Sequence, residues 1–131
     1  CLGIRKDAND RTLFDTAKEL DVKYVLSDTF QMQFLDEINT WIDAFIKIVD
    51  KVYVTIDLDG FSSAYAPGVS APSPMGFTPE IVLECLKTII GSGKLISMDI
   101  AEMNPKFDVD GQTAKLAASL LHYVMHALWG N

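Results

Sequence analysis

The strongest constraint on the fold is an apolar run, Val52 to Ile56, that is followed at once by Asp57 and Asp59. All of its residues except Tyr53 are β-branched, which favours a strand that is buried on both faces. Because side chains alternate along an extended chain, Asp57 and Asp59 should point to the same side. A buried strand that ends in acids is typical of an open parallel sheet, in which ligands bind beyond the carboxyl ends of the strands.

The remaining sequence alternates strands with helices. Apolar runs predict strands at 1–4, 22–26, 52–57 and 94–100, and apolar residues at helical spacing predict helices at about 10–20, 30–49, 78–91 and 112–129. This order predicts an α/β fold with three layers, α/β/α, around a mainly parallel sheet with right-handed crossovers. No linker divides the pattern, so we expect a single domain. The chain begins inside a predicted strand, so we expect that domain to be incomplete in this chain.

The charge and composition exclude several classes of protein. The chain has 131 residues and a net charge of −7, which makes nucleic acid and anionic membranes unsuitable partners. Its hydrophobic content of 49% indicates a globular chain, and no apolar run is long enough to span a bilayer. The two cysteines, Cys1 and Cys85, lie in a predicted strand and a predicted helix. This placement favours two reduced thiols and a cytoplasmic protein.

Asp57 and Asp59 are the first candidates for a functional site. Two adjacent carboxylates repel each other, so a divalent cation between them would be favoured. Glu102 follows the strand predicted at 94–100, and it would reach the same edge if the two strands are parallel neighbours. The alternative is that the two aspartates only cap the following loop through backbone hydrogen bonds. That loop, 58–77, is rich in proline and glycine, and long ordered loops at strand ends commonly carry function.

His122 and His126 form a second candidate pair. They are four residues apart on the last predicted helix, so they share a face, and this spacing can hold zinc. No Glu follows the first histidine and no third ligand is evident. The alternative is therefore favoured, namely two solvated histidines near a helix C-terminus. Trp41 and Phe45 have the spacing of core packing rather than of ligand contacts.

The segment from Thr55 to Pro72 resembles the signature of the ureohydrolase family, which contains arginases, agmatinases and formimidoylglutamases. That signature is an apolar strand, Asp-x-Asp, a short gap, Ala-Pro-Gly and a further proline. The segment Ser97 to Pro105 is similar to the family's later motif, in which a strand ends in Asp-x-x-Glu-x-Asn-Pro. Residues 3–5, Gly-Ile-Arg, also resemble the strand that precedes this half. The sequence Ala-Pro-Gly-Val-Ser-Ala-Pro at 66–72 most resembles the corresponding sequence of the formimidoylglutamase branch.

The resemblance implies a hydrolase of linear amidines whose complete site holds two divalent metals, usually manganese. Asp57 would bridge the metals, Asp59 would bind one of them, and a hydroxide shared by the metals would be the nucleophile. Glu102 would hold the positively charged substrate group through charge-assisted hydrogen bonds. In the formimidoylglutamase branch the reaction converts N-formimino-L-glutamate and water to L-glutamate and formamide, in histidine degradation. Agmatinase and arginase are the alternatives. The implied partners are a small amidine or guanidine substrate and further copies of the chain in a homo-oligomer.

The chain differs from the family pattern in two ways, which affect the branch of the family and the activity that we expect. Many members have a further Asp-Pro after Asp-x-Asp, where this chain has Ser62 and Ser63, and formimidoylglutamases vary at this point. The family also completes its metal site with a His and an Asp-x-His-x-Asp motif upstream, and this chain contains neither. We therefore expect residues 1–131 to be the carboxyl-terminal portion of a single ureohydrolase domain, and to be inactive alone.

Two classes outside this family are also considered. A phosphatase of the haloacid-dehalogenase type has Asp-x-Asp-Gly after an apolar strand, but here Phe61 stands where that class has threonine. The Ala-Pro-Gly loop would also have no role in such an enzyme. The non-enzyme alternative is a folded fragment without catalytic function, whose uncovered apolar edge would favour self-association.

Overall fold

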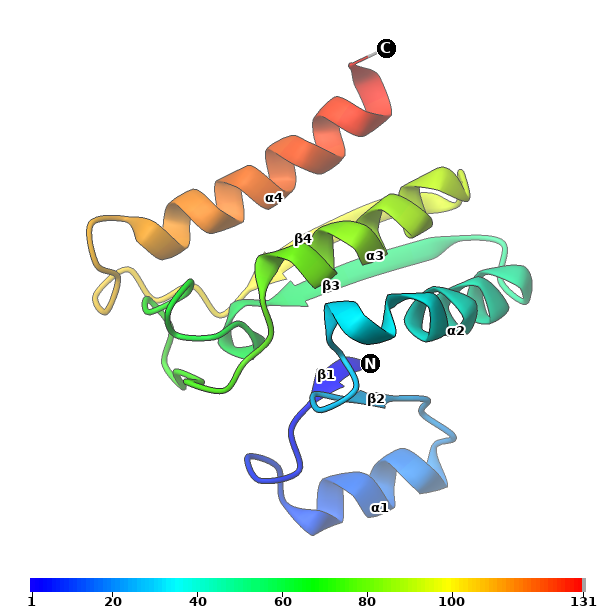
Figure 1. Ribbon diagram of the computed structural model, residues 1–131, viewed down its shortest axis with the longest axis horizontal. Coiled ribbons are helices and arrows are strands. Elements are labelled where there is room, and N and C mark those ends of the chain that lie inside the picture. The colour runs from blue at the N-terminus through cyan, green and yellow to red at the C-terminus, as the bar shows by residue number, and fades with distance from the viewer. Residues whose placement is uncertain (131) are drawn as a thin grey trace.

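The computed structural model describes residues 1–130, in which four strands alternate with four α-helices (Figure 1). A 3₁₀ turn at Met32–Phe34 precedes the second helix, and another at Leu58–Gly60 follows the third strand. The elements in chain order are β1 (Leu2–Ile4), α1 (Arg11–Glu19), β2 (Val25–Leu26), α2 (Leu35–Lys47), β3 (Val52–Asp57), α3 (Pro79–Gly91), β4 (Leu95–Ala101) and α4 (Gln112–Trp129).

The strands form two parallel pairs, β1 with β2 and β3 with β4. In the second pair Ile56 lies opposite Ile100, and Asp57 lies opposite Ala101. Because the pair is parallel and in register, both strands end at the same edge. The predicted parallel α/β architecture is confirmed, but the described strands make two short sheets rather than one continuous sheet.

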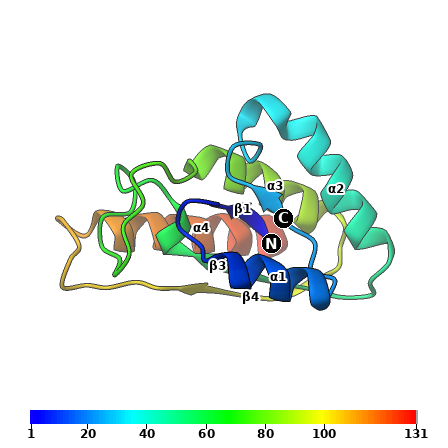
Figure 2. The ribbon, with the colours of Figure 1, turned by 90° about the horizontal axis from the view of Figure 1, so that it is seen from below.

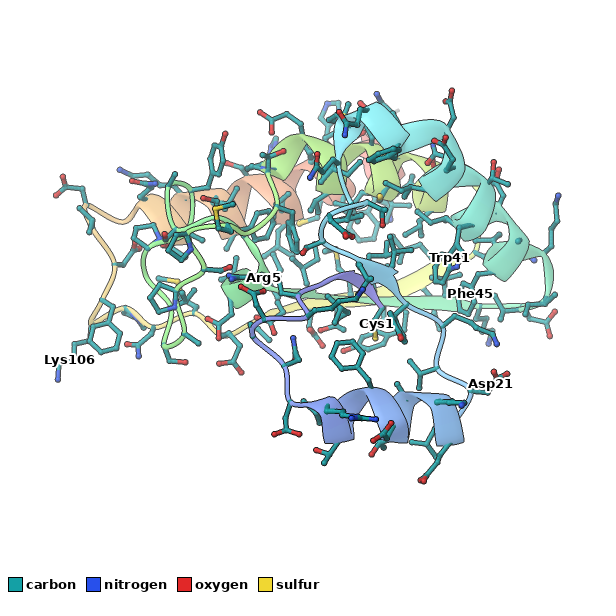
Figure 3. The ribbon with its side chains drawn as sticks, turned by 60° about the horizontal axis from the view of Figure 1, so that its bottom comes forward. Cys1, Arg5, Asp21, Trp41, Phe45 and Lys106 are labelled. Carbon is teal, nitrogen blue, oxygen red and sulfur yellow. The ribbon has the colours of Figure 1, made fainter. Side chains whose placement is uncertain are left out.

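Helices α2, α3 and α4 lie on the same side of β3 and β4, whereas α1 lies apart from them, beyond β1 and β2 (Figures 2 and 3). The core lies between these three helices and the strand pair. It contains Ile38, Ile42 and Ile46 of α2, Ile81, Val82, Cys85 and Leu86 of α3, Leu120 and Val124 of α4, and Val52 and Ile56 of β3. No helix among the described residues is long and apolar enough to cross a membrane.

Local sequence explains the start of α3, and a contact distant in sequence is made at the end of α2. Pro79 occupies the first turn of α3, where its missing N–H costs nothing, and Glu80 adds a favourable negative charge there. The ammonium group of Lys94 donates to the carbonyls of Ile46 and Val49, both at 2.7 Å, at the end of α2. Lys94 thereby ties the end of α2 to the start of β4.

Several predicted boundaries and faces are wrong. The strand predicted at 22–26 is formed only at Val25–Leu26, and the helix predicted from 30 begins at Leu35 after the 3₁₀ turn. Phe45 has the helical spacing of core packing but is 45% exposed, and the apolar residues Leu121 and Met125 of α4 are 39% and 55% exposed. Periodicity identifies an apolar face but does not show that another element packs on it, and within the described residues none covers these side chains.

One aromatic side chain joins the first strand pair to the second. The ring of Phe77 packs edge-to-face against Phe30 and Phe61, with centroid distances of 5.3 and 4.7 Å. A Cβ added to Gly3 or to Gly60 would lie 2.6 Å from this ring. The two glycines therefore let the backbone of β1 and the backbone after β3 approach the same ring.

We predict that Phe77→Ala destabilises the chain by about 3 kcal/mol, because it removes a ring that fills the space between both strand pairs. Chemical unfolding of the variant and of Phe107→Ala, whose side chain is 52% exposed, measures the effect. Equal losses of stability in the two variants would contradict this role for Phe77.

Candidate metal and substrate site

The carboxylate of Asp57 caps the turn that follows β3. Its Oδ1 accepts a hydrogen bond from the backbone N–H of Asp59 at 2.8 Å, which starts the 3₁₀ turn Leu58–Gly60. The capping alternative raised by the sequence is therefore correct for one oxygen of Asp57. The side chain itself is exposed, so its other oxygen remains available to a ligand.

Asp59 is in a different environment. Its Oδ1 is buried and has no hydrogen-bond partner among the described residues. Burial raises the pKa of this carboxyl above its ordinary value, and the nearby negative charges of Asp57 and Glu102 raise it further. The backbone N–H of Ala71 opposes the rise only in part. A buried carboxylate oxygen without a donor, beside two other acids, fits a cation ligand better than a capping residue.

Glu102 follows β4 directly and faces the same edge. Its side chain is exposed, and its charge reaches Asp59. Its backbone has a φ of +67°, a left-handed conformation that a residue with a side chain rarely adopts. The parallel pairing of β3 and β4 thus places Asp57, Asp59 and Glu102 at the same edge of the strand pair, although these acids are not grouped closely enough to hold a metal ion by themselves.

A long loop, residues 61–77, follows β3 and meets the segment after β4, where the Asn104 N–H donates to the carbonyl of Gly68 at 2.8 Å. Its two ends pair with each other, since Ser62 N–H donates to the carbonyl of Phe77 and Ser63 N–H donates to the carbonyl of Ser73, both at 2.9 Å. The Ser62 hydroxyl also donates to the carbonyl of Pro74 at 3.1 Å. The guanidinium of Arg5, which lies beside this loop in Figure 3, donates to the Ser73 hydroxyl. These contacts explain how a chain segment without regular structure keeps one conformation.

The sequence reasoning missed the polar side chains that support the edge. Asp99 of β4 accepts hydrogen bonds from the hydroxyls of Tyr53 and Thr55 on the sheet face opposite the three helices, the latter at 2.7 Å. Thr113, the first buried residue of α4, accepts a bond from the backbone N–H of Gly68 in the loop at 2.7 Å. Asp99 is part of the quoted strand-end motif, but no local pattern distinguishes Thr113.

The histidine pair does not complete a metal site. His122 and His126 are both exposed, and their ring centroids are 6.2 Å apart. Within residues 1–130 no three His, Cys, Asp or Glu side chains are grouped closely enough to hold a metal ion. The favoured interpretation of two solvated histidines agrees with this geometry. Asp57 and Asp59 therefore fit part of a cation site, and the described residues offer no third ligand.

The chain is similar to one group of known proteins over nearly its full length. The sequence model of the arginase family matches residues 1–127. The chain is 44% identical over 125 residues to the formimidoylglutamase of Staphylococcus carnosus, and 42% identical over 124 residues to that of Rhodococcus jostii. These alignments cover 95% of this chain but 40% and 39% of the relatives. The chain thus spans about two fifths of the length of the curated relatives it matches.

Solved structures show the same architecture. A crystal structure of formimidoylglutamase from Bacillus subtilis superposes with a TM-score of 0.85 at 28% identity, covering 98% of this chain and 40% of that one. The agmatine ureohydrolase of Thermoplasma volcanium gives 0.80 at 29% identity, covering 97% and 41%. An arginase from Bacillus subtilis gives 0.83 over 99% and 44%, and its 23% identity shows the shared fold alone. The predicted arginase-like fold is confirmed, as is its being incomplete in this chain.

We predict that Asp59→Asn raises the melting temperature of the metal-free chain at pH 7. The ionised carboxylate opposes folding there, since its pKa is raised in the folded state from the ordinary value of 3.8. As the pH falls through the raised pKa, the native carboxyl takes up a proton and its cost disappears. The stability difference between variant and parent should therefore shrink with decreasing pH in thermal unfolding.

Asp57→Ala is the matched comparison, and it should lower the melting temperature because the 3₁₀ turn loses its cap. A fall in melting temperature for Asp59→Asn at pH 7 would show that the ionised Asp59 stabilises the metal-free chain.

Proposed function

The chain belongs to the arginase family, and from this premise we propose that it is part of a metal-dependent hydrolase that cleaves a C–N bond of N-formimino-L-glutamate. The products would be L-glutamate and formamide, a step in histidine degradation. Identity of 42–44% to relatives named formimidoylglutamase supports this substrate over agmatine and arginine. The buried Oδ1 of Asp59, which has no hydrogen-bond partner within residues 1–130, is the observation on the chain itself that supports a metal-dependent reaction.

Asp57 and Asp59 would hold manganese, the metal that the family resemblance implies, with two ions in a complete site. When bound, manganese supplies Lewis acidity and lowers the pKa of coordinated water. The chain's own contribution is to fix the ligands. The Asp59 N–H holds one oxygen of Asp57 in place, and the fold buries one oxygen of Asp59 with no hydrogen-bond donor from the described part of the chain.

Glu102 would bind the cationic amidine group of the substrate. An amidinium presents two parallel N–H donors, and a carboxylate can accept both at once. The exposed side chain of Glu102 follows β4 at the edge where Asp57 and Asp59 follow β3, so a substrate held by Glu102 would lie at the same edge as the proposed metal ligands. The protein would then bind the substrate through charge and orient it before the reaction.

The remaining features concern the setting of this reaction. We propose that the described strands and helices form a portion of a single domain, because one core joins α2, α3, α4 and β3. Cys1 and Cys85 are free, and burial raises the pKa of the Cys85 thiol to about 12. Unpaired thiols fit a reducing compartment such as the cytoplasm. A homo-oligomer and a small-molecule substrate, without nucleic-acid or membrane partners, complete the proposal.

We predict that the 131-residue chain alone does not hydrolyse N-formimino-L-glutamate when manganese is added. Two carboxylates leave most coordination positions to water, so the ions should bind weakly and exchange freely. Formamide release measures activity, and manganese-induced broadening of NMR signals near Asp59 measures binding. Sustained turnover by the isolated chain would contradict the prediction.

A chimera tests the function directly. The chain replaces the segment of the Staphylococcus carnosus formimidoylglutamase to which it is 44% identical. We predict manganese-dependent formamide release, and a loss on the order of 100-fold or more in Asp59→Asn, because removing a ligand should exceed the effect of removing a supporting group. Asp43→Asn, at an exposed position on α2, is the matched control and should retain activity. A folded chimera that hydrolyses agmatine or arginine but not N-formimino-L-glutamate would overturn the substrate assignment.

A further inference from the structure

The left-handed backbone of Glu102 is held from both sides. On one side Ala101, the last residue of β4, is paired with Asp57 of β3. On the other side the backbone N–H of Asn104 donates to the carbonyl of Gly68 at 2.8 Å. The bend between these two fixed points includes Glu102, whose φ is +67°. Such a conformation persists where the surrounding structure over-determines it, and it is found preferentially at functional sites.

Gly68 is fixed in turn by the start of α4. Its backbone N–H donates to the Thr113 hydroxyl at 2.7 Å, in a fully buried bond, and Thr113 is 0% exposed. A Cβ at Gly68 would lie 2.6 Å from the Cβ of Asp108 and 2.8 Å from its Cα, so the loop backbone packs directly on the segment before α4. This close approach, rather than a special φ, explains the glycine.

Asp108 holds Thr113 in position. The Asp108 carboxylate accepts from the N–H groups of Thr113 and Ala114, at 2.9 and 3.1 Å. Desolvation raises the pKa of Asp108, but these bonds, together with bonds from the Thr113 hydroxyl and the Val109 N–H, outweigh it and leave the pKa below its ordinary value. The hydroxyl of Thr113 thus connects the first turn of α4 with Gly68, and Gly68 connects it with Asn104.

We propose that Thr113 is a positioning residue for the substrate-binding carboxylate: its hydroxyl, acting through Gly68 and Asn104, holds Glu102 in the conformation that presents the carboxylate to an amidinium or guanidinium cation. This inference rests on the role of Glu102 in the proposed function. It does not depend on which amidine is the substrate. A valine at 113 keeps the shape of the side chain but leaves the buried Gly68 N–H without an acceptor.

The test on the 131-residue chain is amide hydrogen exchange. Thr113→Val should accelerate exchange at Gly68 and at Asn104 by about tenfold or more, because the Gly68 N–H loses its acceptor and the Gly68 carbonyl, which accepts from Asn104, is then no longer held in place. Exchange in β3, for example at Val54, should not change. Thr113→Ser keeps the hydroxyl and should behave as the parent. Thr40→Val is the matched control, since it removes a hydroxyl that bonds only its own helix, to the carbonyl of Asp36. Unchanged exchange at Asn104 in Thr113→Val would overturn the proposal.

The kinetic test uses the chimera and whichever amidine it hydrolyses. Loss of a ground-state contact should raise KM by about tenfold with little change in kcat for Thr113→Val, and Thr113→Ser should restore the parental KM. A merely structural role would instead lower the active fraction, reducing apparent kcat at constant KM, and that result would overturn the proposal. If N-formimino-L-glutamate is not the substrate, the same shift in KM with agmatine still supports the role of Thr113. The experiment can therefore contradict the substrate assignment without contradicting the positioning role of Thr113, and the reverse.

Discussion

The parallel pairing of β3 with β4 determines where the candidate functional side chains lie. In parallel strands that are in register, the carboxyl ends meet at one edge, so acids from distant parts of the sequence become neighbours. The core of α2, α3 and α4 secures this pairing from one side by packing on Val52 and Ile56. The carboxylates at the ends of β3 and β4 repel one another, and the apolar packing that stabilises the strand pair offsets this repulsion.

The candidate site illustrates a conflict between stability and function. Two features of Asp59 would favour cation binding, namely a buried oxygen without a hydrogen-bond donor among the described residues and nearby acidic side chains. Both features also raise the free energy of the metal-free folded state. A chain selected for stability alone would place a donor beside that oxygen, as it does for Asp57. The two aspartates, two residues apart, thus differ in environment: one oxygen of Asp57 is held by a backbone donor, whereas the Asp59 Oδ1 has none among the described residues.

Much of the fold could be predicted because its signals are local. The β-branched run before Asp57, the Pro79 helix start and the alternation of elements each depend on a few adjacent residues. What failed depends on distant parts of the molecule. The exposure of Phe45 follows from the absence, among the described residues, of an element packed on it. Thr113 escaped notice because the backbone group that it binds lies 45 residues away in sequence, and a lone threonine at a helix start usually indicates only a cap.

The contact of Phe77 with two glycines has a consequence for how sequences of this kind can diverge. Gly3 and Gly60 both face one ring, so a methyl group at either position requires the ring to move or shrink. A smaller side chain at 77 would then leave a void beside the other glycine. A substitution at Gly3, Gly60 or Phe77 alone should therefore be destabilising. Substitutions at these three positions should be tolerated mainly in combination. Because Gly60 follows Asp59 directly, substitutions in the first strand are constrained by the geometry around Asp59, the proposed metal ligand, which that strand does not contact.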